Sequence, residues 1–155
     1  MFQENSLRRL IEIENKLNKE QRNLLQINSM RNFLLFFNKM HDERDKIKIA
    51  ELIDQYFERI EMFDFIINRQ ISNELGFSYT LKISPYYKHS FGFKYFNSSP
   101  LVPLIQGLLV DLGLTLIGIL ERIEFLPIAT IILFGRWLYV RIFYVPKNRV
   151  FGIRY

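Results

Sequence analysis

Two charged side chains interrupt the most apolar part of the chain, and they are the first residues whose chemistry needs an explanation. Asp111 lies within an apolar run from Leu101 to Leu120, and Arg136 lies within a second run from Phe125 to Val145. Each run has about the length that a helix needs to cross a bilayer core of roughly 30 Å. A charge at that depth costs on the order of 3 kcal/mol unless it meets a partner.

The two charges reach similar depths if the runs form an antiparallel hairpin. Asp111 lies about 11 to 12 residues before the middle of the polar turn 121–124, and Arg136 lies about 13 to 14 residues after it. At about 1.5 Å per residue, the two levels differ by roughly 3 Å. We therefore predict an intramembrane ion pair between Asp111 and Arg136 that fixes the register of the hairpin. The alternatives are a contact with a neighbouring subunit and a proton path that includes Gln106.

Small and polar residues next to these charges predict the faces on which the two helices pack. On the first helix they follow a 4,4,3 spacing, at Gly107, Asp111, Thr115 and Gly118. On the second helix, Ala129 lies seven residues before Arg136 and shares its face. Because small side chains let two helices approach closely, we expect the hairpin to pack through these positions.

Cations and aromatic rings flank the two runs and predict their orientation. Three cations precede the first run and three follow the second, namely Lys82, Lys88, Lys94, Lys147, Arg149 and Arg154. Since the turn between the runs is net acidic, the positive-inside rule places both ends in the cytoplasm or the organelle matrix. The expected interfacial anchors are Trp137, Tyr139 and Tyr144. The alternative is one span, with the last segment lying on the membrane surface as a basic amphipathic helix.

Residues 1–76 predict a soluble antiparallel hairpin of two helices. Apolar residues recur at helical spacing through 5–39, and the polar segment 38–45 is the expected turn. A second helix runs to about Leu75 and ends at Gly76, where a left-handed C-cap glycine is expected. Its seam has coiled-coil spacing, at Ile49, Ile53, Tyr56, Ile60, Phe63 and Ile67.

Apolar residues outside these seams predict a surface for a partner protein. The run Phe33 to Phe37 cannot face a single groove between two helices, and Phe57, Phe65 and Ile66 lie off the main seam of the second helix. A large uncovered apolar surface marks an interaction site. We therefore expect the soluble hairpin to bind another subunit through these residues.

Residues 77–100 predict an aromatic connector with an extended conformation. Apolar and polar residues alternate through 77–84, which favours a strand, and Pro85 interrupts the pattern. A small β-hairpin and an extended segment at the membrane interface both remain open. The overall prediction is a mainly α protein in four parts: the helical hairpin 1–76, the connector 77–100, a transmembrane hairpin 101–145 (spans 101–120 and 125–145) and a basic tail 146–155.

The sequence lacks the residues and motifs that several kinds of catalysis and metal binding require. The chain has no cysteine, and His41 and His89, its two histidines, lack metal-like spacing. P-loop, dinucleotide-binding and nucleophile-elbow motifs are absent from the sequence. Membrane proximity accounts for the aromatic and basic stretch 86–96, so a nucleic-acid partner is not expected. We predict that the protein is not an enzyme and holds no cofactor, although a bound lipid is compatible with the hairpin.

Composition adds an expectation about origin. Phe, Ile, Asn, Lys and Tyr are abundant while Ala50 and Ala129 are the only alanines, a bias typical of AT-rich coding. The N-terminal residues have no apolar signal region and carry several glutamates, so neither a secretory signal nor a transit peptide is expected there. In composition and layout the chain resembles small organelle-encoded subunits of respiratory-chain or ATP-synthase membrane complexes.

This resemblance implies a non-catalytic accessory or assembly subunit of the mitochondrial inner membrane, with both termini on the matrix side. Its expected partners are the other subunits of the membrane complex and the lipid bilayer. Two other functions remain open at this point. One is a proton- or ion-conducting element that uses Asp111, and the other is a free-standing viral or phage membrane-active protein.

Overall fold

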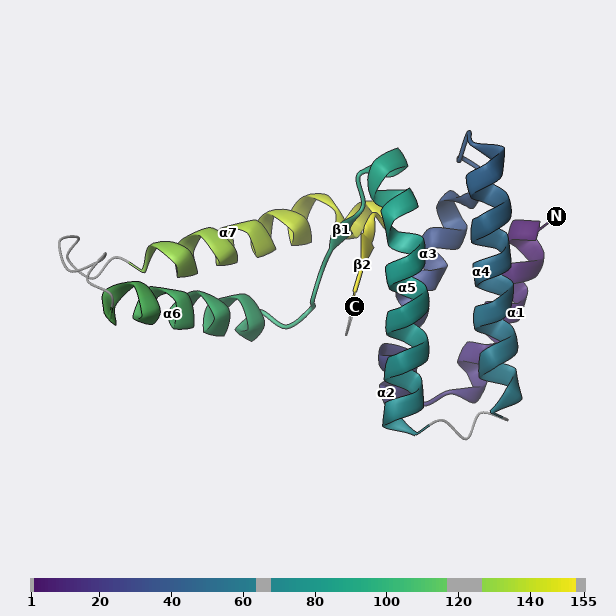
Figure 1. Cartoon of the computed structure of the whole chain (residues 1–155), viewed down its shortest axis with the longest axis horizontal. Coiled ribbons are helices and arrows are strands. Elements are labelled where there is room, and N and C mark those ends of the chain that lie inside the picture. The colour runs from purple at the N-terminus through teal and green to yellow at the C-terminus, as the bar shows by residue number, and fades with distance from the viewer. Residues whose placement is uncertain (1, 64–67, 117–126, 153–155) are drawn as a thin grey trace.

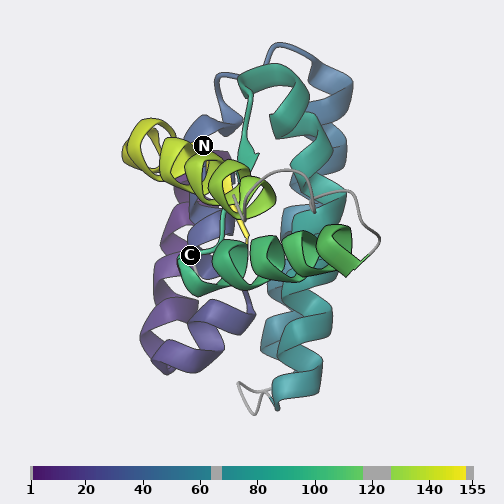
Figure 2. The same cartoon turned by 90° about the vertical axis from the view of Figure 1, so that its left-hand side faces the viewer.

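A computed structural model describes residues 2–63, 68–116 and 127–152, and within these ranges the chain is mainly helical (Figure 1). Five helices form a bundle: α1 (Phe2–Lys16), α2 (Lys19–Leu24), α3 (Ile27–Phe37), α4 (Glu43–Met62) and α5 (Arg69–Phe91). Two further helices, α6 (Leu101–Leu116) and α7 (Ile128–Phe143), lie side by side and extend away from the bundle (Figures 1 and 2). We call α6 and α7 the arm.

The predicted single helix over 5–39 is wrong, because the chain forms three helices there. Asn18 begins α2 with a capping box, in which the Asn18 side chain accepts the Gln21 N–H at 2.9 Å and the Gln21 side chain accepts the Asn18 N–H at 3.0 Å. Gln26, between α2 and α3, has a left-handed φ of 58°. The buried Tyr56 hydroxyl donates to the Leu25 carbonyl at this break, at 2.9 Å.

The apolar run in α3 is buried inside the bundle, which corrects the prediction that it needs a partner. Phe33 and Leu34 are fully buried and Phe36 and Phe37 nearly so, while Leu35 is 37% exposed. Contacts from α1, α2, α5 and the C-terminal strand surround α3. Phe57 is also fully buried. Phe65 and Ile66, the other two residues of the predicted surface, lie outside the described residues.

The seam predicted for the second helix agrees with the structure of α4, but the predicted extent to Leu75 is wrong, because α4 ends at Met62 and α5 begins at Arg69. Its buried residues include Ile49, Ile53, Tyr56 and Ile60. Phe63 is partly buried, and Ile67 lies outside the described residues. The predicted polar turn supplies the start of this helix, because the Asp42 side chain accepts the backbone N–H groups of Arg44 and Asp45.

The predicted extended connector is wrong over most of its length, because residues 77–91 belong to helix α5. Burial follows a spacing of three or four positions, at Thr80, Ile83, Ser84 and Tyr87. Phe77 and Leu81, which belong to the alternating apolar pattern, are about half exposed. Pro85 within this helix cannot donate to the Leu81 carbonyl, and the Ser84 hydroxyl donates to that carbonyl at 3.4 Å instead.

Gly76 lies inside α5 and does not cap a helix, which corrects another prediction. A Cβ at this position would lie 2.3 Å from the Leu24 carbonyl oxygen and 2.8 Å from the Leu25 carbonyl carbon. The glycine therefore allows α5 to contact the backbone at the end of α2. Gly92, with φ 67°, provides the left-handed cap at the C-terminal end of α5.

Two short strands connect the arm to the bundle. β1 (Lys94–Tyr95) precedes α6, β2 (Val150–Phe151) follows α7 and a 3-10 turn at Val145–Lys147, and the two strands pair in parallel. The Asn32 side chain donates to the Val150 carbonyl at 2.9 Å, and the Gly152 N–H donates to the Ser29 hydroxyl oxygen at 3.0 Å. The predicted basic tail is therefore built into the bundle as far as Gly152.

Candidate functional site

The arm exposes apolar side chains on its outside. In α6 they include Leu101, Ile105, Leu108, Leu109, Leu112 and Leu116, and in α7 Ile131, Ile132, Leu138, Ile142 and Phe143. The segment Ile128–Lys147 has 20 residues, and its most apolar 18-residue stretch has a mean hydropathy of 1.5 and is 11% buried. It is therefore long and apolar enough to cross a membrane. α6 is a shorter apolar helix. Because its apolar side chains mostly face outward, α7 is not buried in the core of this fold.

Asp111 lies between the two helices of the arm, with 7% of its surface exposed. One carboxylate oxygen accepts the Ala129 N–H at 2.8 Å. The other accepts the Thr130 N–H at 3.0 Å and the Thr130 hydroxyl at 2.7 Å. Three donors from the first turn of α7 therefore hold this carboxylate.

These bonds make Asp111 the N-terminal cap of a helix other than its own. The first N–H groups of any helix have no partner within that helix. Pro127, at the N-cap position of α7, provides no side-chain hydrogen bond. The partial positive charge at the start of a helix also favours a carboxylate there. The N-cap position of α7 holds Pro127 and not Ser, Thr, Asp or Asn, which is a sequence signal for this role, although it does not name the residue that supplies the cap.

The predicted packing residues lie close to this cap. A Cβ on Gly107 would come within 2.4 Å of the Thr130 Cα, so the two helices approach closely there. The Thr115 hydroxyl donates to the Asp111 carbonyl of its own helix at 2.9 Å. Ala129 contributes its backbone N–H to Asp111. Gly118, the last of the predicted packing residues, lies outside the described residues.

The predicted Asp111–Arg136 ion pair does not form. Asp111 lies level with Ala129 and Thr130, and Arg136 follows Thr130 by six residues, which is about 9 Å of helix. The sequence estimate took the polar turn as the midpoint of the hairpin, whereas the observed register follows the close approach at Gly107 and the cap at the start of α7. Arg136 is exposed, and no ion pair involves it within the described part of the chain.

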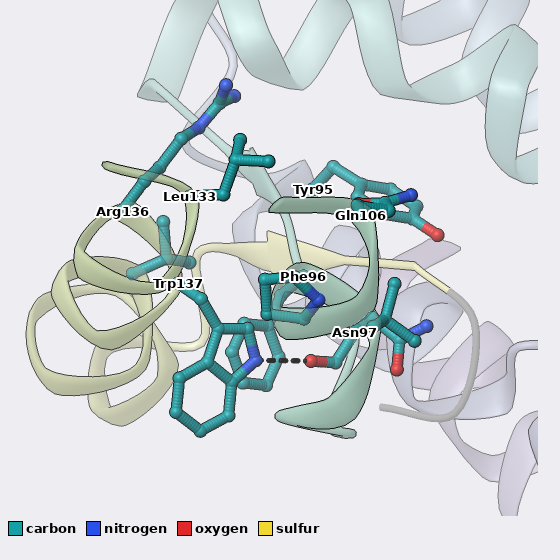
Figure 3. A pocket seen from close by; sticks show the side chains of 10 residues that line it. Tyr95, Phe96, Asn97, Gln106, Leu133, Arg136 and Trp137 are labelled. Carbon is teal, nitrogen blue, oxygen red and sulfur yellow. Dashed lines mark hydrogen bonds between the residues drawn. The ribbon is translucent and has the colours of Figure 1, made fainter. Parts of the chain in front are cut away.

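Trp137, one of the predicted interfacial anchors, packs inward at the base of the arm. It is 8% exposed, and its indole N–H donates to the Asn97 carbonyl at 2.7 Å (Figure 3). Its ring stacks on Phe96 and Phe134, with centroid distances of 5.9 and 5.6 Å. This packing joins α7 to the segment that leads into α6.

The other two predicted anchors lie nearer the bundle. Tyr139 is half exposed, and its ring contacts those of Phe143 and Tyr144. The Lys94 ammonium group lies 5.8 Å from the Tyr144 ring centroid. Aromatic and basic groups therefore meet where the arm joins the bundle.

A groove of about 220 Å³ opens beside Trp137, between α6, α7 and the segment from β1 to α6. Its lining includes Tyr95, Phe96, Asn97, Gln106, Arg136 and Trp137. Figure 3 shows Arg136 on one side of this groove and Gln106 and Tyr95 on the other. The groove therefore combines an apolar wall with one cation and several hydrogen-bonding groups.

Comparison of the chain with family models, with curated proteins and with solved structures finds no match. Within residues 2–63, 68–116 and 127–152, no group of three or more Asp, Glu or His side chains is placed to hold a metal ion.

Proposed function

We propose that the protein is a non-catalytic accessory or assembly subunit of a multi-subunit membrane complex, held in the bilayer by the arm. One observation carries this proposal, namely that the arm has apolar side chains outside and its carboxylate inside. Lipid tails provide no hydrogen-bond partners, so a polar group within a bilayer needs a partner within the protein. Asp111 and the start of α7 meet this requirement for each other.

The lengths of the two apolar runs in the sequence support a hairpin that spans the membrane twice. The apolar sequence of the first run continues from α6 to Leu120, giving the 20 or so residues that a span needs. The second span corresponds to Ile128–Lys147. α6 begins and α7 ends at the same side of the bundle (Figure 1).

Charge supports an orientation with the bundle on the cytoplasmic or matrix side. Lys94 and Lys147 lie where the arm joins the bundle, whereas the turn 121–124 at the other end of the arm sequence is net acidic. This distribution follows the positive-inside rule. Together with the AT-rich composition, it favours the mitochondrial inner membrane and a respiratory-chain or ATP-synthase complex.

Cysteine labelling tests the membrane anchor directly, because the natural chain contains no cysteine. Leu109→Cys places a thiol on the exposed face of α6, and Glu51→Cys places one on the exposed face of α4. In sealed inner-membrane vesicles with the matrix side outward, an impermeant maleimide should label Glu51→Cys alone. Labelling of Leu109→Cys at the same rate without detergent would contradict the anchor.

Native gel electrophoresis tests the assignment to a complex. The protein should migrate with an assembly of several hundred kilodaltons, roughly twenty times its own mass or more. Migration as a free protein that permeabilises membranes when expressed alone would favour the viral or phage alternative. Loss of transport in Asp111→Asn with assembly intact would favour the alternative of a proton- or ion-conducting element that uses Asp111. The three donors that hold the carboxylate support a structural role for Asp111 instead.

A further inference from the structure

We propose that the groove beside Trp137 binds an anionic phospholipid, with the headgroup phosphate at Arg136 and the start of an acyl chain along the apolar wall. This inference rests on the proposed function, because the lipid reaches the groove only if the arm lies in a bilayer.

The first argument is the unmatched charge of Arg136. Asp111 is held by α7 and does not pair with Arg136. The sequence on either side has no other acid to offer: residues 75–110 and 125–155 contain eight Lys and Arg residues and no Asp or Glu. A guanidinium in the membrane-facing part of a protein is costly without an anion or water. Phosphate suits it, since guanidinium binds phosphate with two parallel hydrogen bonds.

The second argument is position along the arm. Arg136 precedes Phe143, the last residue of α7, by seven residues, which is about 10 Å of helix. A long arginine side chain can extend its charged end from this level toward the membrane surface. Gln106 faces it from α6 and lies five residues after Leu101, near the start of that helix. Both polar groups therefore lie on the bundle side of the arm, where headgroups are expected.

The third argument is the apolar wall of the groove. Trp137 and Phe96 stack beneath it, and Leu133 and Val140 line it on α7 (Figure 3). Ile132, the chain neighbour of Leu133, is exposed on the outside of α7. An acyl chain can therefore pass from the groove into the surrounding lipid without crossing a polar surface. An acidic peptide would gain nothing from such an apolar path, so the apolar wall favours a lipid.

Neighbouring cations favour an anionic lipid over a zwitterionic one. The Arg141 guanidinium lies 5.0 Å from the Trp137 ring centroid, and Lys94 contacts the Tyr144 ring. Such cations are attracted to an anionic membrane surface. These cations together favour a headgroup that carries net negative charge, as in phosphatidylglycerol or cardiolipin.

Trp137 also provides the measurement, because it is the only tryptophan of the chain and lines the groove. Bromine on a lipid tail quenches tryptophan fluorescence at short range. The full-length protein is reconstituted in phosphatidylcholine vesicles that contain a small, varied fraction of brominated phosphatidylglycerol or of brominated phosphatidylcholine. We expect roughly tenfold stronger quenching per brominated lipid for phosphatidylglycerol, because the choline cation of phosphatidylcholine competes with Arg136 for the phosphate of its own headgroup.

Arg136→Gln should bring this preference to within about twofold, because the phosphate loses its guanidinium partner. Lys147→Gln is the matched control: it removes one cation from the same end of the arm, outside the groove, and should keep the preference. Excess inorganic phosphate at constant ionic strength should not reverse the quenching if the acyl chain lies in the groove.

The outcomes separate this inference from the proposed function. Equal quenching by both brominated lipids, or an unchanged preference in Arg136→Gln, would overturn the lipid site while leaving the membrane anchor intact. If an acidic segment of a neighbouring subunit filled the groove, the two brominated lipids would also quench Trp137 equally. No quenching by either lipid would contradict the membrane anchor itself.

Discussion

The bundle and the arm contain similar apolar residues but place them on opposite sides. In the bundle, Phe33, Ile53 and Tyr56 are fully buried, and charged residues such as Glu51 face outward. In the arm, Leu109 and Ile132 are exposed by more than 60%, and Asp111 is buried between the helices. The proposed membrane anchor accounts for this difference, since burial of apolar surface is favourable against water but gains nothing against lipid tails.

Polar groups are used differently in the two regions as well. On the surface of the bundle, the Arg9 guanidinium donates to both carboxylate oxygens of Glu61, at 2.8 and 2.6 Å. Exposed ion pairs of this kind contribute about 0–1 kcal/mol. In the arm, Asp111 satisfies backbone groups that have no other partner, and leaving such groups unpaired costs about 1–3 kcal/mol each. The buried carboxylate is therefore the more important of the two for stability.

The largest effect is expected from removing the cap between the helices of the arm. Asp111→Ala leaves the Ala129 and Thr130 N–H groups without an acceptor, and should lower the free energy of unfolding by about 3 kcal/mol. Asp111→Asn keeps one acceptor oxygen and should cost about half as much. Circular dichroism during detergent denaturation measures both. Leu112→Ala, at an exposed neighbouring position, is the control, and equal losses in Asp111→Ala and Leu112→Ala would contradict the cap.

The second largest effect is expected at the close approach of α6 and α7. Gly107→Ala adds a methyl group whose carbon would lie 2.4 Å from the Thr130 Cα. This substitution should destabilise the arm by about 2 kcal/mol. Gly113→Ala is a matched control on the same helix, because its Cβ meets nothing within 4 Å. It should be neutral or slightly stabilising. The same denaturation measurement applies, and equal effects of both alanines would show that the helices do not approach at Gly107.

A smaller effect is expected at the helix break in the bundle. Tyr56→Phe removes the hydrogen bond to the Leu25 carbonyl and should cost about 1–2 kcal/mol, with no effect on the arm. Burial raises the pKa of Tyr56, so its hydroxyl stays protonated and able to donate at any ordinary pH. Tyr79→Phe is the control, since this ring contacts Tyr56 but is only partly buried. Urea unfolding measures both variants, and an equal loss would contradict the role of the bond.

The smallest effect is the pH dependence of the ion pair on the bundle. The hydrogen bond from Arg9 lowers the pKa of Glu61 below its ordinary value, so the pair stabilises the fold above about pH 4.5 and this contribution is lost as the pH falls further. Burial raises the pKa of the neighbouring Asp54, which acts in the opposite direction. We expect a net loss of a few tenths of a kcal/mol, because solvent screens both groups.

Urea unfolding at pH 6 and at pH 3.5 measures this change. Glu61→Gln removes the part that depends on the ion pair, so the difference between its stabilities at the two pH values should be smaller than that of the natural chain. An unchanged difference would show that other carboxylates govern the acid sensitivity of the bundle.

Local patterns predicted the parts of the fold in which one helix face decides burial. The α4 seam follows from its spacing, and the two apolar runs of the arm correspond to α6 and α7. The predictions failed where burial surrounds an element or does not follow hydrophobicity. α3 is covered over most of its surface, and α5 buries Gly76, Thr80 and Ser84 while exposing Phe77. Neither case leaves a stripe that a periodicity argument can detect.

The candidate site shows the same division. The sequence singled out Asp111 as the organising residue of the hairpin and Arg136 as an unusual charge. It paired them because both lie in apolar runs at similar estimated depths. The actual partner of Asp111 is the backbone at the start of α7, which has the same chemistry in every sequence. Only the three-dimensional register reveals such a partner.

The sequence by itself therefore determined the apolar runs, the cation-rich flanks and the isolated carboxylate of this protein, because these depend on residue type and spacing along the chain. The tertiary structure decided which groups meet. It broke the first predicted helix at Gln26, where Tyr56 satisfies the Leu25 carbonyl, and it placed α5 against the end of α2 through Gly76. It also placed the Asp111 carboxylate at the first backbone N–H groups of α7, and Arg136 at an open groove. Such contacts between distant segments exist only once the helices have packed.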